Sequence, residues 1–141
     1  MENCVFCKIV SGIIPSRKLY EDGQVLAFLD INPIAEGHTL VIPKKHATNM
    51  FDIAEEEAAQ LMRGIKNVAR LLEKAYGSNL TITNANGRLA SQLVGHLHFH
   101  LIPRRENDLF AKADEVTAID RRLKLDSAQF DAVLRKILEK K

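Results

Sequence analysis

The sequence predicts an α+β fold in which a mostly antiparallel sheet packs with one long central helix. Apolar runs typical of strands follow one another over residues 18–43, and two more lie over residues 80–84 and 95–104. Between these groups, apolar residues recur at helical spacing from residue 52 to residue 76. Strands that follow one another directly, with the helices separate from them, favour an antiparallel sheet.

Four strands can be placed before the last run. The segment "KLYEDGQVLAFLDI" contains two short strands around Asp22–Gly23, a dipeptide that favours a hairpin turn. "HTLVIP" is a third strand, which ends at Pro43, and "LTITN" is a fourth strand of alternating type. A loop with glycine and asparagine, "ANGRLASQLVG", then leads into the last strand.

Two helices are expected. In the helix over residues 52–76, Asp52 and Glu55 form a capping-box pattern, and Gly77 fits the position after the helix end. A second helix lies near the C-terminus, with Asp126 as its N-cap. The apolar positions are Ala58, Leu61, Ile65, Val68 and Leu72 in the first helix, and Phe130, Val133, Leu134, Ile137 and Leu138 in the second.

The composition is that of one ordinary globular domain. Of 141 residues, 46% are apolar and 27% are charged, and the net charge of +2 comes from interleaved acidic and basic residues. This balance gives no electrostatic reason to expect nucleic-acid binding. The sequence has no signal-peptide pattern and no apolar run long enough to span a membrane. We therefore expect a cytoplasmic protein with reduced cysteines.

The last strand carries an alternating row of histidines. "GHLHFHLIPR", residues 95–104, places His96, His98 and His100 two residues apart, with apolar residues between them. Because strand residues two apart share a face, the imidazoles form one row and the apolar side chains form the other. A solvent-exposed polar face, or histidines satisfied by neighbours, is the plain alternative. Three histidines in register favour chemistry or metal binding.

A cysteine pair near the N-terminus indicates a metal site. "CVFC" places Cys4 and Cys7 so that both thiolates can bind one ion, although the same spacing suits a redox dithiol or inert thiols. A structural zinc needs two further ligands, usually histidines. The sequence offers five candidate histidines, among them His46, just past a strand, and His96, the first of the row.

Several of these motifs, in this order, resemble the histidine triad (HIT) superfamily in its Hint-like bacterial branch. They are "CVFCKIVSGIIP", "AFLDINPIAEGHTLVIPKKH" and "HLHFHLIPR". The resemblance implies an HIT core over residues 1–105, with a short N-terminal zinc-knuckle helix. Residues 106–141 would be a C-terminal extension that ends in a helix and packs on the same single domain.

The resemblance also implies separate tasks for the histidines. His98 would be the nucleophile that attacks the α-phosphorus of a nucleotide conjugate, and His100 would support it. Zinc would be held by the set Cys4, Cys7, His46 and His96. A neutral imidazole is a good nucleophile near pH 7, and a nucleotidyl-histidine divides one displacement into two easier ones.

Further site residues follow from the same resemblance. Gln92, His100 and backbone N–H groups of the preceding loop would donate to the phosphate, and His38 would be a hydrogen-bond partner in the active site. Asp30 would bind the ribose hydroxyls; taken alone, it also fits a turn cap at a strand end. The purine would lie between apolar walls, with Asn86 among the nucleotide-binding residues. The walls are Phe6, Ile9, Ile14, Phe28 and Ile31.

The loop before the histidine row departs from the family pattern. Members usually have G-Q-S/T-V here, and this chain has Ser91, Gln92, Leu93 and Val94. Leu93 replaces a hydroxyl that handles the phosphate or leaving group, and Ser91 replaces a glycine where the backbone needs freedom. Ala85 stands where the family commonly has a polar residue, for which Asn84 or Asn86 is the substitute. The loss of one such donor can slow an enzyme by about a hundredfold.

These features predict a purine-nucleotide phosphoramidase or nucleotidyl hydrolase that works through His98. The alternative kept open by Ser91, Leu93 and Ala85 is a protein that binds nucleotides with little or no turnover. A third possibility is a zinc-stabilised interaction module. The expected partner is a purine nucleotide or its conjugate, without nucleic acid or membrane. The resemblance also implies a homodimer, for which the helix over residues 52–76 offers one surface.

Overall fold

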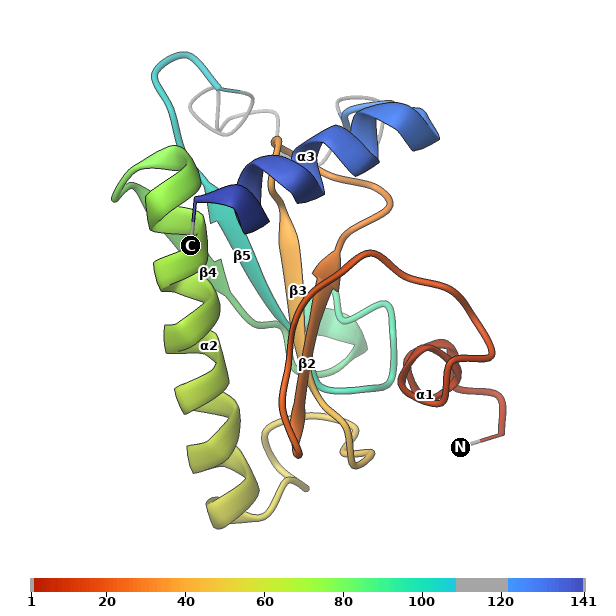
Figure 1. Ribbon diagram of the computed structural model, residues 1–141. Coiled ribbons are helices and arrows are strands. Elements are labelled where there is room, and N and C mark those ends of the chain that lie inside the picture. The colour runs from red at the N-terminus through yellow and green to blue at the C-terminus, as the bar shows by residue number, and fades with distance from the viewer. Residues whose placement is uncertain (1, 109–121, 141) are drawn as a thin grey trace.

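The computed structural model describes residues 2–108 and 122–140 and confirms the α+β architecture predicted from the sequence. Five strands form one antiparallel sheet, the long helix α2 lies along it, and short helices lie near both ends of the chain (Figure 1). The elements are α1 Val5–Val10, β1 Lys18–Glu21, β2 Val25–Leu29, β3 Thr39–Pro43, α2 Glu55–Tyr76, β4 Leu80–Thr83, the 3₁₀ turn η1 Arg88–Ala90, β5 Phe99–Pro103 and α3 Ser127–Glu139.

The sheet has the strand order β1-β2-β3-β5-β4, so β5 lies between two partners. All four pairings are antiparallel. In this register His100 is opposite Leu40 of β3 on one side and Thr83 of β4 on the other. The last histidine of the row is therefore held by the hydrogen-bonded ladders of two neighbouring strands.

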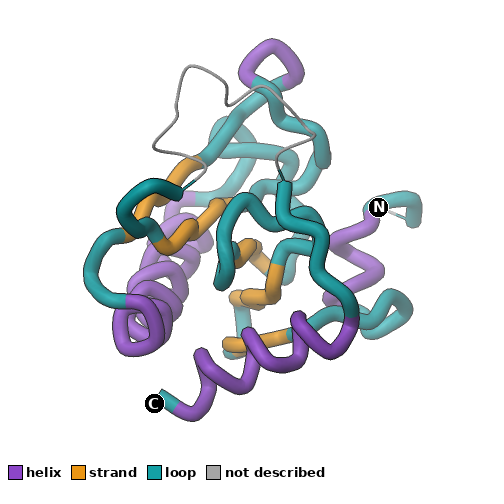
Figure 2. The backbone as a smooth tube through the Cα atoms, turned by 90° about the horizontal axis from the view of Figure 1, so that it is seen from above, coloured by secondary structure: helices purple, strands orange, loops and turns teal. Residues whose placement is uncertain are grey.

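The two faces of the sheet pack against different elements. Figure 2 looks along the strands, with α2 and α1 on opposite sides of them. Residues that face α2 join the main core, including Val25, Val41 and Leu101, whereas the alternate residues Phe28 and Leu40 pack with α1. Because opposed residues in an antiparallel pair share a face, Leu40 places His100 on the α1 face. The candidate site lies on that face.

The long helix begins three residues later than the sequence pattern indicates. Its N-cap is Ala54, without a side-chain cap, so the capping box predicted for Asp52 and Glu55 is wrong. The Asp52 carboxylate instead accepts the backbone N–H groups of Thr48 and Asn49 in the preceding turn, at 3.0 and 2.9 Å. A short acidic side chain that binds local backbone donors is no longer available to the helix.

The ends of both helices agree with the remaining predictions. Gly77 follows α2 with φ +88°, a conformation that favours glycine. Asp126 caps α3 in a complete capping box with Gln129. Helix α3 contributes Phe130, Val133 and Ile137 to the same core as α2, and so the C-terminal helix packs directly on the sheet and α2.

The histidine strand is shorter than predicted. Strand β5 begins at Phe99, and His96 and His98 lie in the irregular segment that leads into it. The predicted alternation nevertheless holds, because Leu97 and Leu101 are in the main core while the three imidazoles are on the opposite side. Among the residues described, no helix has the length and apolarity needed to cross a bilayer.

Candidate functional site

Four predicted metal ligands meet between α1, the end of β3 and the segment before β5. The sulfur atoms of Cys4 and Cys7 and one ring nitrogen each of His46 and His96 all lie within 4.8 Å of one another. His96 Nδ1 is 3.4 Å from Cys4 Sγ and 3.6 Å from Cys7 Sγ, and His46 Nδ1 is 3.3 Å from Cys7 Sγ. Tetrahedral zinc with bonds of about 2.0 to 2.3 Å places its ligand atoms at such separations. The set could therefore hold a metal ion.

The surrounding contacts prepare these atoms for a cation. His96 Nε2 lies 2.8 Å from the carbonyl oxygen of Pro43, so it carries the proton and Nδ1 presents its lone pair to the sulfur atoms. Burial lowers the pKa of His96 and favours the neutral ring. Burial and the neighbouring Cys4 raise the pKa of the Cys7 thiol, because two adjacent thiolates repel. A bound dication would offset that repulsion.

A cavity of about 560 Å³ opens on the same face of the sheet. The five apolar residues predicted to hold the purine all line it, together with Asp30, His98 and His100. Phe6, Ile9 and Phe28 are buried, and Ile31 is 76% exposed at the edge. The wall is thus apolar with a few polar groups, as is typical of small-molecule sites. The five apolar residues are Phe6, Ile9, Ile14, Phe28 and Ile31.

His98 has one nitrogen bound to the main chain and its ring in the cavity wall. Its Nδ1 lies 2.7 Å from the carbonyl oxygen of His96, which can only accept a hydrogen bond. The proton is therefore on Nδ1, and Nε2 keeps its lone pair. The Phe6 ring packs edge-on against the imidazole, with ring centres 5.4 Å apart. The geometry leaves Nε2 available to act as a nucleophile.

A hydrogen-bond chain fixes the neighbouring rings. The backbone N–H of Ile34 donates to His38 Nδ1 at 3.0 Å, and His38 Nε2 lies 2.9 Å from His100 Nδ1. His38 consequently carries its proton on Nε2 and donates it to His100, which leaves the His100 proton on its own Nε2. Burial lowers the pKa of both rings to about 4, so both are neutral at pH 7. His100 can then donate from Nε2 without carrying charge.

Asp30 belongs to this network and to the cavity. Its Oδ1 accepts the backbone N–H of Asn32 at 2.8 Å, which is the turn-cap role that the sequence also allowed. Its Oδ2 lies 3.5 Å from His38 Nε2 and 4.0 Å from His100 Nδ1. The carboxylate, in the wall beside the apolar residues, can accept hydrogen bonds from a ligand as well.

Gln92 and Asn86, which were predicted to contact the nucleotide, do not line the cavity. The Gln92 side chain accepts from Gly87 N–H and donates to the carbonyl oxygens of Thr48 and Val94, so its amide binds the loop and the turn before α2. Asn86 accepts from Met50 N–H and donates to Asn84 Oδ1. Both side chains bind neighbouring main-chain and side-chain groups, and neither residue is part of the cavity lining.

The altered loop has the conformation that its usual glycine would favour. Ser91 has φ +68° and ψ +26°, in the left-handed region. Leu93 is 89% exposed at the cavity wall and brings no hydroxyl. Neither Asn84 nor Asn86 lines the cavity, so neither supplies there the polar group that Ala85 lacks. Asn84 Nδ2 instead donates to the main-chain carbonyl of His98 at 2.9 Å.

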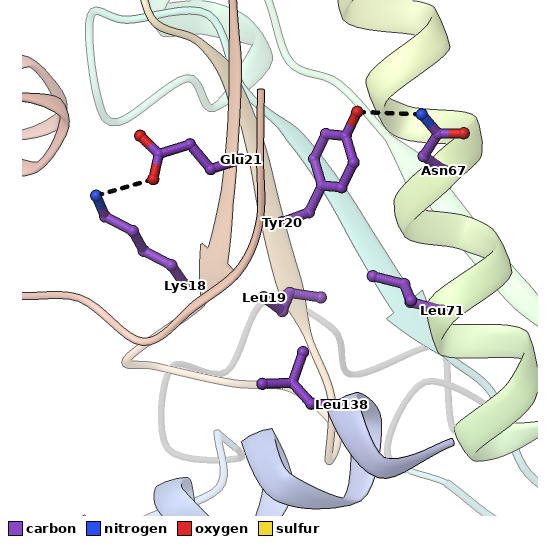
Figure 3. Close-up of a pocket in the computed structure, with 7 residues that line it drawn as sticks. All are labelled: Lys18, Leu19, Tyr20, Glu21, Asn67, Leu71 and Leu138. Atoms are coloured by element: carbon purple, nitrogen blue, oxygen red, sulfur yellow. Dashed lines mark hydrogen bonds and ion pairs between the residues drawn. The ribbon is translucent and has the colours of Figure 1, made fainter. Parts of the chain in front are cut away.

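The cavity also includes residues that sequence reasoning did not identify. Arg122, from the segment before α3, lies outside every recognised motif, and nothing in the sequence around it indicates a binding site. Arg17 lies just after the motif "CVFCKIVSGIIP", and Asn32 lies within "AFLDINPIAEGHTLVIPKKH", but their residue types alone do not indicate a site. A second hollow, of about 440 Å³, lies between β1, α2 and α3 (Figure 3). Its polar groups pair locally, as Asn67 Nδ2 does with the Tyr20 hydroxyl at 3.1 Å, and it has no histidine or cysteine.

Comparisons with known proteins agree with this site. The HIT domain model matches residues 11–107. An adenosine 5′-monophosphoramidase of Schizosaccharomyces pombe is 48% identical over 103 residues, covering 72% of this chain and 74% of that protein. An adenylylsulfatase of Arabidopsis thaliana is 34% identical over 139 residues, covering 96% of this chain and 70% of that protein.

The solved structures agree as well. A zinc-bound histidine triad family protein from Mycobacterium smegmatis is similar with a TM-score of 0.79 and 34% identity, covering 98% of this chain and 94% of that chain. The fold, the ordered motifs and the match over residues 11–107 lead to one conclusion. The chain belongs to the HIT domain family.

Proposed function

We propose that the protein is a nucleotidyl hydrolase that cleaves purine nucleotide conjugates at the α-phosphorus through His98. The observation that carries the proposal is the His98 ring, whose Nδ1 is bound to the carbonyl of His96 while the ring lines the cavity. The names of the two relatives, adenosine 5′-monophosphoramidase and adenylylsulfatase, add support, because both indicate cleavage at an adenylyl phosphorus.

The chemistry proceeds in two displacements. His98 Nε2 attacks the α-phosphorus, the bond from phosphorus to the leaving group breaks, and that group leaves with its electron pair and a proton from water. The His98 ring becomes positively charged, and the His96 carbonyl stabilises this charge through the Nδ1 proton. Water then attacks the phosphorus, the phosphorus–nitrogen bond breaks, and the nucleoside monophosphate leaves. His100 donates from Nε2 to a phosphate oxygen during both steps.

The nucleoside fits the remaining walls. A purine is accommodated between Phe6, Phe28 and the neighbouring isoleucines, and the Asp30 carboxylate accepts hydrogen bonds from the ribose hydroxyls. We place the leaving group beside Ser91 and Leu93, where Leu93 brings no hydroxyl to the cavity wall. This difference predicts a slow enzyme rather than an inactive one.

The decisive variant is His98→Asn. Its amide can still donate to the His96 carbonyl, but it has no nucleophilic nitrogen. With an adenosine phosphoramidate as substrate, we expect AMP release to fall at least about a thousandfold, while AMP binding measured by calorimetry changes less than about threefold. Equal AMP release by the variant and the wild type would disprove the nucleophile assignment.

A second candidate function is nucleotide binding without turnover. Leu93 favours it, since this residue removes a hydroxyl from the cavity wall. Rapid quenching followed by intact-mass measurement separates the two candidates. A covalent adenylyl adduct on the wild type, absent from His98→Asn, supports the hydrolase. AMP binding without adduct or AMP release supports the binding protein.

We also propose that the ion held by Cys4, Cys7, His46 and His96 is zinc with a structural role. The donor set of two sulfurs and two ring nitrogens is the one that structural zinc prefers, and all four positions are occupied by protein atoms. When bound, zinc would join α1 to the segment before β5 and so hold the main chain that supports His98. It takes no part in the displacement steps.

The protein is further proposed to form a homodimer through the exposed edge of the sheet. Among the described residues, strand β4 pairs on one side only. Ile82, opposite Leu101, lies on the α2 face and is 46% exposed. Met62 of α2 is 55% exposed. Unpaired edge strands with apolar side chains favour pairing with another chain. Sedimentation of wild type and Ile82→Lys tests this; a monomeric wild type would refute it.

A further inference from the structure

Arg122 is fixed against the loop that follows β2. Its Nη1 donates to the carbonyl oxygen of Asn32 at 2.6 Å, and the next residue, Leu123, donates its backbone N–H to Pro33 at 2.7 Å. The loop carries Asp30 at its start, and Arg122 lines the same cavity as Asp30, His98 and His100. A residue from the C-terminal extension, beyond the part that the HIT domain model matches, therefore contributes to the site wall.

Two cationic side chains of the described part of the chain line the cavity, and their hydrogen bonds differ. Arg17 Nε pairs with Asp131 at 3.0 Å, and its Nη2 donates to Ser127 Oγ at 2.8 Å, so its guanidinium is directed to α3. Within the described residues, Arg122 donates from Nη1 only. A guanidinium has five N–H donors in a planar fork, and most of those of Arg122 remain available for a ligand.

The other described residues that line the cavity bring no positive charge to an anionic ligand. His38 and His100 are neutral at pH 7, since burial and the charge of Arg122 itself lower the pKa of both rings to about 4. Asp30 adds a negative charge to the same wall. A nucleotide phosphate that enters next to a carboxylate and neutral imidazoles needs a compensating cation. Among the described residues that line the cavity, Arg122 is the one that is free to supply it.

We propose that Arg122 binds the phosphate of the nucleotide, so that the C-terminal extension selects anionic nucleotides over neutral nucleosides. The inference rests on the proposed nucleotide site and assigns its charge selectivity to one residue. The Nη1 bond to Asn32 orients the guanidinium plane and leaves the Nε and Nη2 donors for two phosphate oxygens. Such paired donors are the geometry in which arginine binds phosphate more strongly than lysine does.

The test compares Arg122→Met with Arg17→Met, a matched loss of one guanidinium from the same cavity. Calorimetry measures the binding of AMP and adenosine to each protein at low and at moderate salt. For Arg122→Met we expect the AMP dissociation constant to rise about tenfold or more, with adenosine binding within about twofold of wild type. Arg17→Met should keep the wild-type ratio of AMP to adenosine affinity.

A second variant separates charge from structure. Arg122→Lys keeps the positive charge and should bind AMP with an affinity between those of the wild type and Arg122→Met. Thermal unfolding of all variants shows whether the segment before α3 stays attached. Equal loss of AMP and adenosine affinity in Arg122→Met would mean a structural role, and this would overturn the inference.

The remaining outcomes distinguish this inference from the proposed function. Wild-type affinity for AMP in Arg122→Met overturns the inference and leaves the hydrolase proposal standing, which His98→Asn tests independently. A wild type that binds neither AMP nor adenosine refutes the proposed function and the inference with it. A selective loss of AMP affinity, partly restored by lysine, supports both.

Discussion

His98 Nδ1 lies 2.7 Å from the carbonyl oxygen of His96, so the residue that faces the cysteine pair also orients the ring in the cavity. The side chain of His96 contacts the two cysteines, and its main-chain carbonyl accepts the hydrogen bond from the proposed nucleophile, His98. Whatever holds His96 in place therefore also holds the proton of His98 on Nδ1. The metal cluster and the cavity are consequently linked through a single residue.

Metal removal should lower stability in the wild type only. With free zinc at 100 to 1,000 times its dissociation constant, we expect a chelator to reduce the free energy of unfolding by about 3 to 4 kcal/mol. Cys7→Ser should start near the chelated value and show no response, because a hydroxyl is a poor zinc ligand. Urea unfolding with and without chelator measures both. A wild type that is indifferent to the chelator would contradict the zinc proposal.

Loss of the Asn84 donor should slow turnover. Asn84 Nδ2 donates to the His98 carbonyl at 2.9 Å, and Asn84→Asp removes this donor at constant size. We expect kcat with an adenosine phosphoramidate to fall about tenfold, with AMP affinity within about twofold of wild type. Asn67→Asp makes the same change at the Tyr20 hydroxyl, outside the site, and should leave kcat unaltered. A similar fall in both variants would count against a positioning role for Asn84.

Ser91→Gly should stabilise the protein. Ser91 has φ +68°, a backbone conformation that costs a residue with a side chain about 1 kcal/mol. Glycine removes most of this cost, so we expect the free energy of unfolding to rise by about 0.5 to 1 kcal/mol. Ser11 has φ −78°, and Ser11→Gly should be neutral or destabilising. Urea denaturation gives both values; a less stable Ser91→Gly would show that the serine side chain compensates for the strain.

Stability should decline in moderate acid because of the two buried imidazoles. The pKa of His38 and of His100 is lowered to about 4, whereas the unfolded rings bind protons near pH 6.5. Between these values the unfolded state binds more protons, so stability is complete above about pH 7 and falls as the pH drops toward 4. We expect a loss on the order of 3 kcal/mol.

The control for this pH dependence is His38→Gln. Glutamine can accept from Ile34 N–H and donate toward His100, but it does not titrate. Its unfolding free energy should vary less between pH 7 and pH 4.5. Chelated protein is used throughout, so that metal release in acid does not contribute, and the lowered pKa of His96 then affects both proteins equally. Identical slopes for wild type and variant would show that these imidazoles do not govern acid sensitivity.

The sequence anticipated the features that depend on local patterns. Apolar spacing identified both helices and the strands, and Asp126 followed a capping rule that needs only neighbouring residues. The four metal ligands came from the family resemblance, and the structure brings them together. Asp52 was misassigned, because two backbone donors in the preceding turn compete for the same carboxylate.

Features that depend on distant contacts were beyond the sequence. The side-chain amide of Gln92 donates to the carbonyl oxygen of Thr48, a residue 44 positions away. No periodicity or motif in the sequence indicates such a pairing. Arg122 reaches the cavity because its segment attaches to Asn32, 90 positions earlier. Neither the type nor the sequence position of these two residues indicates a special role. The fold determines which of their N–H donors are already bound to the protein and which can reach a ligand.

The segment before β5 obtains its shape from several neighbours rather than from a ladder. Leu97 N–H donates to Ala47, Asn84 donates to His98, and His96 contacts Pro43. These tethers come from two stretches of chain, residues 43–47 and Asn84, and none of them lines the cavity. Reactivity at this position can accordingly be adjusted by changes well away from the bound molecule. Related chains could thus diverge in speed while their pocket residues stay the same.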